Sequence, residues 1–339
     1  MKYTVAILFG GEGVEREVSR LGKNTLSALI DRSLFEPLFV EISKNGEWYI
    51  EHNPRRKTFP VLLGGERGLF SDGRIIPIDA AFPLLHGDMG EDGNIQGLLR
   101  AAHIPFVGCT TLSGAVAADK ILTKAIAREL SIKVVPGTAL IEKGSGAPDA
   151  ERARVSAEEA VGYPMFIKPS GLGSSLGAGA VFSERDFPAA YLKAAVLGSG
   201  RVLAEKFLPR RRELECAWFS DGIRTFVSPP AEVKYSAPFY SYDEKYESGK
   251  TTALITNPEL PVEISESIRK KTARLAELIG CRDLCRADFF LSDGELYFNE
   301  INTMPGMTES SLWLTLAEGT GLSKKEIITA LLLSAVRRA

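Results

Sequence analysis

The chain has 339 residues, a length that predicts two or three domains. Hydrophobic residues make up 45% and charged residues 25%, as in an ordinary globular protein with a large core. The 41 lysines and arginines nearly balance the 43 aspartates and glutamates, which leaves a formal charge of −2. This balance argues against a nucleic-acid binder or a membrane-surface protein, because both usually carry a basic excess.

Other features of the composition bear on the compartment and on metal binding. The apolar N-terminal run lacks a cleavage region, and no run reaches the roughly 18 apolar residues of a membrane helix. The 4 cysteines are too scattered for a disulfide framework, and the 3 histidines are too few for a multi-histidine metal site. We therefore expect a cytoplasmic protein without a membrane segment, in which any metal is held by carboxylates.

The first third of the chain alternates strand and helix patterns. The continuous apolar run 5–9 predicts a parallel strand that is covered on both faces, and apolar residues then recur at helical spacing over 18–29. A second strand is expected over 76–85 and a helix over 93–102. This order predicts an open α/β domain at residues 1–112, with strand-end loops facing a ligand crevice.

Two further domains are expected, with a boundary near residue 206. In the second, residues 113–205, the pattern predicts one long helix over 115–130 and strands that flank a glycine-rich loop at 171–177. The third, residues 206–339, contains an aromatic-rich loop and ends in a hairpin followed by a helix. The overall fold class is α/β, with mixed α+β character in the second and third domains.

The final hairpin carries the sharpest chemical signal. Because residues i and i+2 share a strand face, Arg286 lies beside Asp288 on one strand, and Glu300 lies beside Asn302 on the other. A three-residue loop, 292–294, would place both pairs on the same face, whereas a two-residue Asp-Gly loop would place them on opposite faces. We predict the three-residue loop.

Two carboxylates and an amide oxygen on one face suit Mg²⁺ and a bound nucleotide phosphate. The alternative is a solvated edge hairpin, but four aromatic residues within the hairpin indicate burial, and buried carboxylates need cations. A second signal is Lys168, which precedes the loop rich in glycine and serine; such a loop offers backbone N–H groups to phosphate. It is not a Walker A loop, and no dinucleotide-binding fingerprint follows the first strand, which argues against an oxidoreductase.

Lys168 with its glycine-rich flap, and Asp288 with Glu300-Ile301-Asn302, together resemble the ATP-grasp superfamily. Four further segments, in order along the chain, resemble D-alanine–D-alanine ligases: Glu15-Arg16-Glu17-Val18-Ser19, His86-Gly87 with Gly90-Glu91-Asp92-Gly93, Tyr240 with Asp243-Glu244-Lys245-Tyr246, and Asn302-Thr303-Met304-Pro305-Gly306-Met307-Thr308. The resemblance implies nucleotide held between two β-sheets and ATP-dependent joining of two D-alanines for peptidoglycan synthesis. It also implies a homodimer.

The resemblance implies a nucleotide site with the following residues. The phosphates would meet three lysines and a flap serine: Lys124, Lys168, Lys245 and Ser175. The base and ribose would meet two glutamates and the chain between them: Glu205, Lys206, Phe207, Leu208 and Glu213. The motif around Glu213 carries one extra residue, so either Glu213 or Glu215 contacts the ribose. Two Mg²⁺ ions, for which Mn²⁺ could substitute, would be held by Asp288, Glu300 and Asn302.

The resemblance also implies two D-alanine subsites. Glu15 would bind the ammonium of the first D-alanine, and Ser174 and Tyr246 would hydrogen-bond with Glu15 as the flap and the aromatic loop close. Arg286 and the N–H of Gly306 would stabilise the acyl phosphate and the tetrahedral intermediate. The carboxylate of the second D-alanine would bind Ser311, near His86.

The aromatic loop, residues 234–252, suits a lid that excludes water from a hydrolysable acyl phosphate.

Three alternative functions are a ligase that uses D-lactate, a ligase that uses D-serine, and a nucleotide-binding module without catalytic activity. Lys245-Tyr246 favours D-alanine over D-lactate, whereas D-serine stays open because the segment before Ser311 departs from the usual pattern. A non-catalytic nucleotide-binding module would be expected to lose Lys168, Arg286, Asp288 or Glu300, and all four are present.

Overall fold

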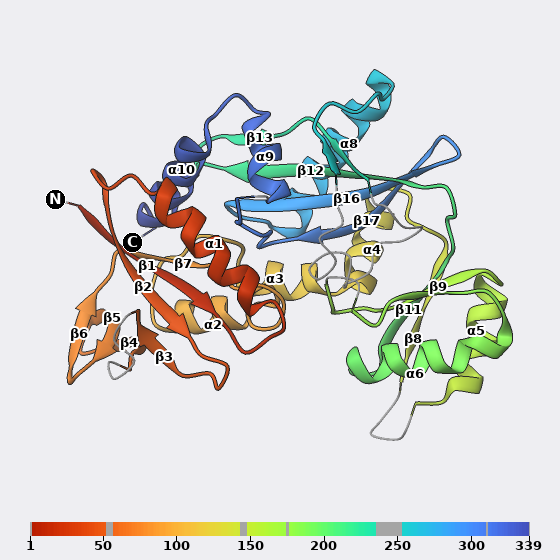
Figure 1. Ribbon diagram of the computed structural model, residues 1–339, viewed down its shortest axis with the longest axis horizontal. Coiled ribbons are helices and arrows are strands. Elements are labelled where there is room, and N and C mark those ends of the chain that lie inside the picture. Colours follow the sequence, from red (N-terminus) through yellow and green to blue (C-terminus); the bar gives the residue numbers. More distant parts are fainter. Residues whose placement is uncertain are drawn as a thin grey trace.

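The computed structural model describes residues 2–51, 57–142, 148–173, 176–234, 253–309 and 311–338. Most of the predicted lid loop lies outside these residues, as do the flap residues Ser174 and Ser175. The described residues form three larger sheets and one small one. Figure 1 shows the N-terminal sheet at one end and, at the other, the sheet covered by α5 (Ala150–Ala160) and α6 (Phe187–Leu197). Within the described ranges, no helix has the length and apolarity to cross a membrane.

The N-terminal sheet is parallel apart from one edge strand, in the order β3-β2-β1-β7. Its elements and the helices beside it are β1 (Tyr3–Gly10), α1 (Arg16–Leu29), β2 (Phe35–Ile42), β3 (Trp48–Ile50), β7 (Ala80–Pro83) and α2 (Asn94–Ala101). Residues 5–9 of β1 are buried, as expected for a strand that is covered on both faces.

The strand predicted over 76–85 is wrong as a single element. It is divided between β6 (Arg74–Pro77) and β7, which belong to different sheets. β6 completes a small antiparallel sheet with β4 (Phe59–Leu63) and β5 (Glu66–Ser71). The chain turns at Asp79, whose carboxylate accepts the N–H of Thr4 at 2.7 Å.

The helix predicted over 115–130 is also wrong as a single element. It is broken at Asp119 into α3 (Thr111–Ala118) and α4 (Lys120–Glu129). Asp119 is extended, with φ −95° and ψ 106°, and its carboxylate caps α4 by accepting the N–H groups of Ile121 and Leu122. The break makes Lys120 the first residue of α4.

The central sheet is antiparallel and runs in the order β10-β9-β11-β8. Its elements and covering helices are β8 (Gly137–Ile141), α5 (Ala150–Ala160), β9 (Met165–Pro169), β10 (Gly179–Val181), η1 (Glu184–Asp186), α6 (Phe187–Leu197) and β11 (Arg201–Lys206). This sheet has a core of its own, in which Phe187 stacks on Tyr191 against Met165 and Ile167.

The third sheet has the order β15-β14-β12-β16-β17, with β13 paired to β12. Its elements are β12 (Arg212–Ser220), β13 (Thr225–Val227), β14 (Ala231–Lys234), β15 (Ala253–Ile255), α8 (Val262–Ile279), β16 (Leu284–Ser292), β17 (Glu295–Asn302), α9 (Leu312–Glu318) and α10 (Lys324–Val336). Strand pairing is antiparallel throughout.

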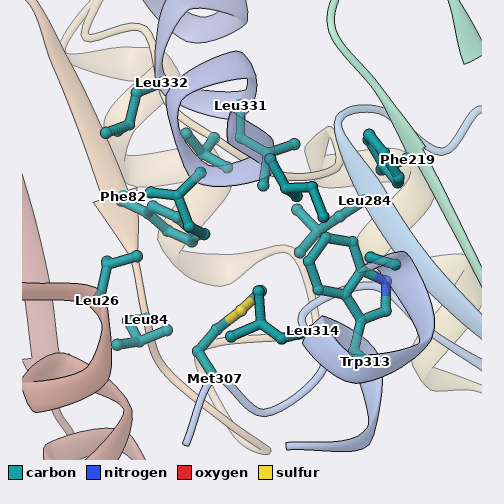
Figure 2. Packing of buried hydrophobic residues seen from close by; sticks show 14 of the residues in the cluster. Leu26, Phe82, Leu84, Phe219, Leu284, Met307, Trp313, Leu314, Leu331 and Leu332 are labelled. Carbon is teal, nitrogen blue, oxygen red and sulfur yellow. The ribbon is translucent and has the colours of Figure 1, made fainter. Parts of the chain in front are cut away.

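The N-terminal and third sheets share one hydrophobic core. Figure 2 shows Leu331 between Phe82 of the N-terminal sheet and Phe219 and Leu284 of the third sheet, with Trp313 next to Leu284. Trp313 is fully buried, and its indole N–H donates to the carbonyl of Cys285 at 2.9 Å. The predicted mixed α/β fold is confirmed, and the shared core fixes the loops of the N-terminal sheet relative to the hairpin β16–β17.

Candidate active site

A cavity of about 550 Å³ lies where the N-terminal loops, the central sheet and the third sheet meet. Fourteen of the predicted site residues line it: Glu15, His86, Lys168, Glu205, Lys206, Phe207, Leu208, Glu213, Arg286, Asp288, Glu300, Asn302, Gly306 and Ser311. Four others, Ser174, Ser175, Lys245 and Tyr246, lie outside the described residues. The structure therefore gathers residues that are up to about 300 positions apart in sequence around one cavity.

The predicted three-residue hairpin turn is wrong. Ser292 pairs with Glu295, so the loop has two residues, Asp293 and Gly294, with φ +48° and +80°. These positive angles belong to the turn that matches the twist of a hairpin. On a regular ladder this turn would place the two polar pairs on opposite faces.

A β-bulge restores the common face. The register shifts between Asp288 and Phe289, so that Phe289 pairs with Phe298 while Asp288 pairs with Glu300, which leaves Asn299 as the extra residue. Arg286 consequently pairs with Asn302. The predicted gathering of the four polar residues is thus observed, but it arises from the bulge and not from the turn.

Two buried lysines donate hydrogen bonds to the bulge. Lys124 Nζ donates to the carbonyl of Phe298 at 3.3 Å, and Lys168 Nζ donates to Asn299 Oδ1 at 2.9 Å. The N–H of Phe298 donates to the carbonyl of Lys133 at 2.8 Å. The central sheet, α4 and the hairpin therefore meet at Phe298 and Asn299, where the bulge changes the register.

Cations surround the paired carboxylates. Arg286 makes two hydrogen bonds of 2.7 Å to Asp288, and Nδ2 of Asn302 donates to the same carboxylate at 3.1 Å. Lys120 Nζ lies 3.0 Å from Glu300. Burial works to raise the pKa of Glu300, but the charges of Lys120 and Lys168 outweigh it and lower this pKa to about 2. Glu300 is therefore ionised at neutral pH.

The hairpin residues fit a magnesium site. They offer two carboxylates and one amide on one face of the hairpin, and all three side chains line the cavity. Oxygen donors of this kind are the ligands that Mg²⁺ prefers. The described residues include no cluster of three or more His, Cys, Asp or Glu side chains that could hold a metal; the amide of Asn302, water or phosphate oxygens would complete the shell of an ion held by the two carboxylates.

Lys124, which we predicted to meet the nucleotide phosphates, does not line the cavity. Its side chain is 1% exposed, and its ammonium is 2.7 Å from Glu205. Lys120 lines the cavity instead and was missed by the sequence analysis. The signal was present in Asp119, a helix-capping residue inside the supposed helix, because a cap at 119 ends one helix and makes Lys120 the first residue of the next.

The first βα turn positions Glu15. Its carboxylate lies so near Gly87 that a Cβ on that glycine would be 2.8 Å from Oε2, which explains the need for glycine there. The turn is fastened by Ser19, which accepts the N–H of Gly10 at 2.8 Å and donates to the carbonyl of Leu84. Arg16 also donates to the carbonyl of Gly11 at 3.0 Å.

The residues predicted for the second subsite, His86 and Ser311, also line the cavity. His86 is 8% exposed, and its Nδ1 is 3.1 Å from the carbonyl of Met304. Ser311 precedes α9, and its hydroxyl donates to the carbonyl of Gly306. These contacts join the loop after β7 to the segment after β17.

The end of β11 and the start of β12 form the part of the cavity where the nucleotide is predicted to bind. Glu213 and Glu215 lie on the same face of β12, and both line the cavity. Arg211 is 2.9 Å from Glu213, whereas Glu215 is 3.1 Å from Arg286. Glu215 is therefore tied to the hairpin carboxylates, and Glu213 lies nearer the strand end.

A cavity between two sheets, lined by lysines and by a carboxylate hairpin, is typical of the ATP-grasp fold. The sequence matches the D-ala D-ala ligase N-terminus over residues 4–109 and the D-ala D-ala ligase C-terminus over residues 126–333. The chain belongs to the D-alanine–D-alanine ligase family, as its motifs predicted. This family uses ATP.

Relatives match over nearly the whole chain. A D-alanine–D-alanine ligase of Deinococcus radiodurans is 39% identical over 337 residues, which cover 98% of each protein. One from Thermoanaerobacter sp. is 35% identical over 99% of this chain and 97% of its own. In structure, D-alanyl-alanine synthetase A of Vibrio cholerae matches with a TM-score of 0.87 at 29% identity, covering 99% of both chains. The VanG D-Ala:D-Ser ligase of Enterococcus faecalis also gives 0.87 at 29% identity, over 98% of this chain and 100% of its own.

Proposed function

We propose that this protein joins two D-alanines into D-alanyl-D-alanine at the expense of ATP, for peptidoglycan synthesis. The observation that carries the proposal is the meeting of Glu15, Arg286 and the Asp288–Glu300 pair around one cavity. These residues supply a carboxylate for an ammonium, a cation for an acyl phosphate, and oxygen ligands for a metal. Family membership supports the same reaction.

The nucleotide is proposed to lie between the central and third sheets. Lys120 and Lys168 meet the phosphates, together with Lys245 and Ser175. Glu205 and the chain through Lys206, Phe207 and Leu208 meet the base. Glu213 is assigned to the ribose in preference to Glu215, because Glu215 pairs with Arg286.

Asp288, Glu300 and Asn302 are proposed to hold two Mg²⁺ ions, for which Mn²⁺ can substitute. When bound, these ions neutralise the charge of the phosphates during transfer. The ionised state of Glu300 at neutral pH favours metal binding, since a ligating carboxylate must be deprotonated.

The substrate residues act in two steps. The carboxylate of the first D-alanine attacks the γ-phosphate, which gives D-alanyl phosphate and ADP; Glu15 holds the ammonium, and Ser174 and Tyr246 close over it. The amine of the second D-alanine then attacks the activated carbonyl and releases phosphate. Arg286 and the N–H of Gly306 stabilise the developing charge, and Ser311 holds the second carboxylate beside His86. The lid loop excludes water.

The larger-scale expectations are part of the same proposal. Residues 1–112, 113–205 and 206–339 form three domains, and the reaction takes place where they meet. The change of sheet between β11 and β12 supports the second boundary. We further propose that the protein is a cytoplasmic homodimer.

A D-alanine–D-serine ligase is the second candidate. The structural match to VanG, at 29% identity, supports it, but the curated relatives at higher identity are named for D-alanine alone. A D-lactate-using ligase is less favoured, because Lys245-Tyr246 follows the D-alanine pattern.

The test is phosphate release from ATP and Mg²⁺ with D-alanine, L-alanine, D-lactate or D-serine, followed by identification of the product. D-Alanine alone should give turnover and D-alanyl-D-alanine. Turnover that needs D-serine beside D-alanine would establish the second candidate. Absence of D-alanine-dependent turnover in folded protein would refute the proposal.

A further inference from the structure

Lys124 is a buried cation beside the cavity with no access to it. It lies on α4, its side chain is 1% exposed, and its ammonium contacts the Glu205 carboxylate at 2.7 Å and the carbonyl of Phe298 at 3.3 Å. Burial lowers the pKa of Lys124 to about 8, although the charge of Glu205 works in the opposite direction. Such a costly charge implies a specific task.

Glu205 is held between two lysines that are not equivalent. Lys124 lies 2.7 Å from Oε1, and Lys168 lies 2.7 Å from Oε2. Lys168 lines the cavity and Lys124 does not. Burial works to raise the pKa of Glu205, but the charges of Lys124 and then Lys168 outweigh it and lower this pKa. The carboxylate is 2% exposed, so it depends on protein cations to stay ionised.

An incoming nucleotide would act differently on the two lysines, because only Lys168 faces the cavity. Lys168 lies on the cavity wall, where an incoming triphosphate is a stronger partner than a shared carboxylate. Lys124 cannot follow, because it is enclosed between α4, β11 and β17. The full charge of Glu205 is then balanced from one side only.

We propose that Lys124 is a positioning residue for base recognition: it keeps Glu205 ionised and oriented after Lys168 has turned to the phosphates. This inference rests on the proposed contact between Glu205 and the base. An ionised carboxylate only accepts hydrogen bonds. It therefore pairs with the exocyclic amine of adenine and repels the carbonyl oxygen at the same position of guanine. Lys124 thus determines selectivity for ATP over GTP without touching either nucleotide.

A purely structural role is the competing explanation, since Lys124 also holds the bulge through Phe298. The two roles differ in what they disturb. Loss of the bulge moves Glu300 and Asn302 and lowers kcat for every nucleotide, whereas loss of the Glu205 counter-ion changes the preference between bases. The ratio of kcat/KM for ATP and GTP therefore separates the two roles.

The test compares Lys124→Met with Lys124→Arg at saturating D-alanine. We expect Lys124→Met to lower the ATP/GTP ratio of kcat/KM by about 10- to 100-fold, mainly through the KM for ATP, because Glu205 becomes protonated and can donate to guanine. The KM for D-alanine should stay within about twofold, and Lys124→Arg should restore most of the ratio. An unchanged ratio in folded Lys124→Met, or an equal fall in kcat for both nucleotides, would overturn the inference.

If Lys124→Met does not fold, a double variant tests the inference instead. Lys124→Met with Glu205→Gln removes both buried charges and should be folded. If Lys124 acts through Glu205, this variant has the same ATP/GTP ratio as Glu205→Gln alone; a further tenfold change contradicts the inference. Displacement of a non-hydrolysable ATP analogue by GTP gives the same ratio without turnover, so an enzyme that fails to use D-alanine would refute the proposed function and not this inference.

Discussion

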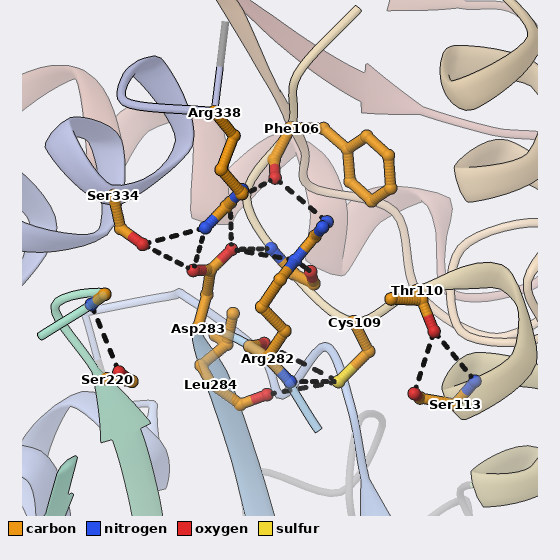
Figure 3. A network of polar contacts seen from close by, with 12 residues as sticks. Phe106, Cys109, Thr110, Ser113, Ser220, Arg282, Asp283, Leu284, Ser334 and Arg338 are labelled. Atoms are coloured by element: carbon orange, nitrogen blue, oxygen red, sulfur yellow. Dashed lines mark hydrogen bonds and ion pairs between the residues drawn. The ribbon is translucent and has the colours of Figure 1, made fainter. Parts of the chain in front are cut away.

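Two aspartate–arginine pairs lie at junctions between the sheets, and they differ in what surrounds the carboxylate. Asp283 precedes β16, is 1% exposed, and is enclosed by donors. It accepts the N–H of Gly108 at 2.8 Å, the hydroxyl of Ser334 at 2.9 Å and two N–H groups of Arg338 at 2.9 and 2.7 Å. Figure 3 shows this network joining the chain near Phe106 to α10 and β16.

Asp288, five residues further along the chain, pairs with Arg286 just as closely but faces the cavity. Its arginine is shared with Glu215 at 3.1 Å, and its neighbour Glu300 depends on Lys120. The Asp283 network leaves no room for a ligand, whereas the Asp288 cluster has cations that an incoming ligand can redistribute. The same residue types thus stabilise the fold in one place and prepare a binding site in the other.

The largest effect is expected from Asp288→Asn, which removes a proposed metal ligand. We expect kcat to fall by at least about 10³-fold, because the neutral amide binds Mg²⁺ far less well and the phosphates lose their counter-charge. The protein should stay folded, because Glu215 still pairs with Arg286. Steady-state kinetics together with circular dichroism check this, and a rate within tenfold of the wild type would contradict the role of Asp288.

The matched substitution Asp283→Asn should affect stability and not chemistry. Removing one partner of a buried pair costs about 3–5 kcal/mol, and we expect the lower end because the Arg338 side chain is 27% exposed and keeps some hydration. Urea unfolding measures the loss, and kcat per folded molecule should be unchanged.

The control for Asp283 is the double variant Asp283→Asn with Arg338→Met. It removes the charge left behind and should recover part of the stability. A loss of kcat in folded Asp283→Asn comparable to that of Asp288→Asn would remove the distinction between the two networks.

Acid should reduce the stabilising contribution of Glu300, in the Asp288 cluster, over a defined pH range. The pKa of Glu300 is lowered from 4.5 to about 2, so its contribution to stability is fully present above pH 4.5 and is lost as the pH falls toward 2. Because a single proton is involved, the slope reaches at most about 1.4 kcal/mol per pH unit. The free energies of unfolding of the wild type and Glu300→Gln, measured with urea, should draw closer as the pH falls from 4.5 toward 2. A difference in free energy of unfolding between the two proteins that stays constant over this range would show that Lys120 and Lys168 do not lower the pKa of Glu300.

The Asp283 network and the Asp288 cluster could not be predicted equally well from the sequence. The strand at 5–9 and the α/β order could be predicted, because a continuous apolar run has few other solutions. The hairpin carboxylates could be predicted from their alternation. The Asp283 network could not, because it joins segments about 175 residues apart through backbone groups that no residue pattern marks.

The errors share one physical cause, which is the local competition between side chains and backbone. Asp119 breaks a helix because its carboxylate caps the next one, and Lys120 rather than Lys124 then lines the cavity. In the hairpin, a two-residue turn and a bulge at Asn299 offset each other, so the predicted face was correct although the predicted turn was wrong. The bulge does leave a trace in the sequence, because the buried apolar residues of β17, Leu296, Phe298 and Ile301, are spaced by two residues and then by three.

The smallest effect, expected from Gly294→Ala, separates the stability of the hairpin from its chemistry. Gly294 has φ +80° and no atom near the position of an added Cβ, so the cost is conformational strain alone, about 1 kcal/mol. Asp293→Asn is the matched control, because asparagine tolerates the φ of +48° at this position. We expect a slightly lower urea midpoint for Gly294→Ala, no change for Asp293→Asn, and wild-type kcat for both. A fall in kcat for Gly294→Ala would mean that the turn, and not the bulge held by Lys124 and Lys168, sets the register of the carboxylates.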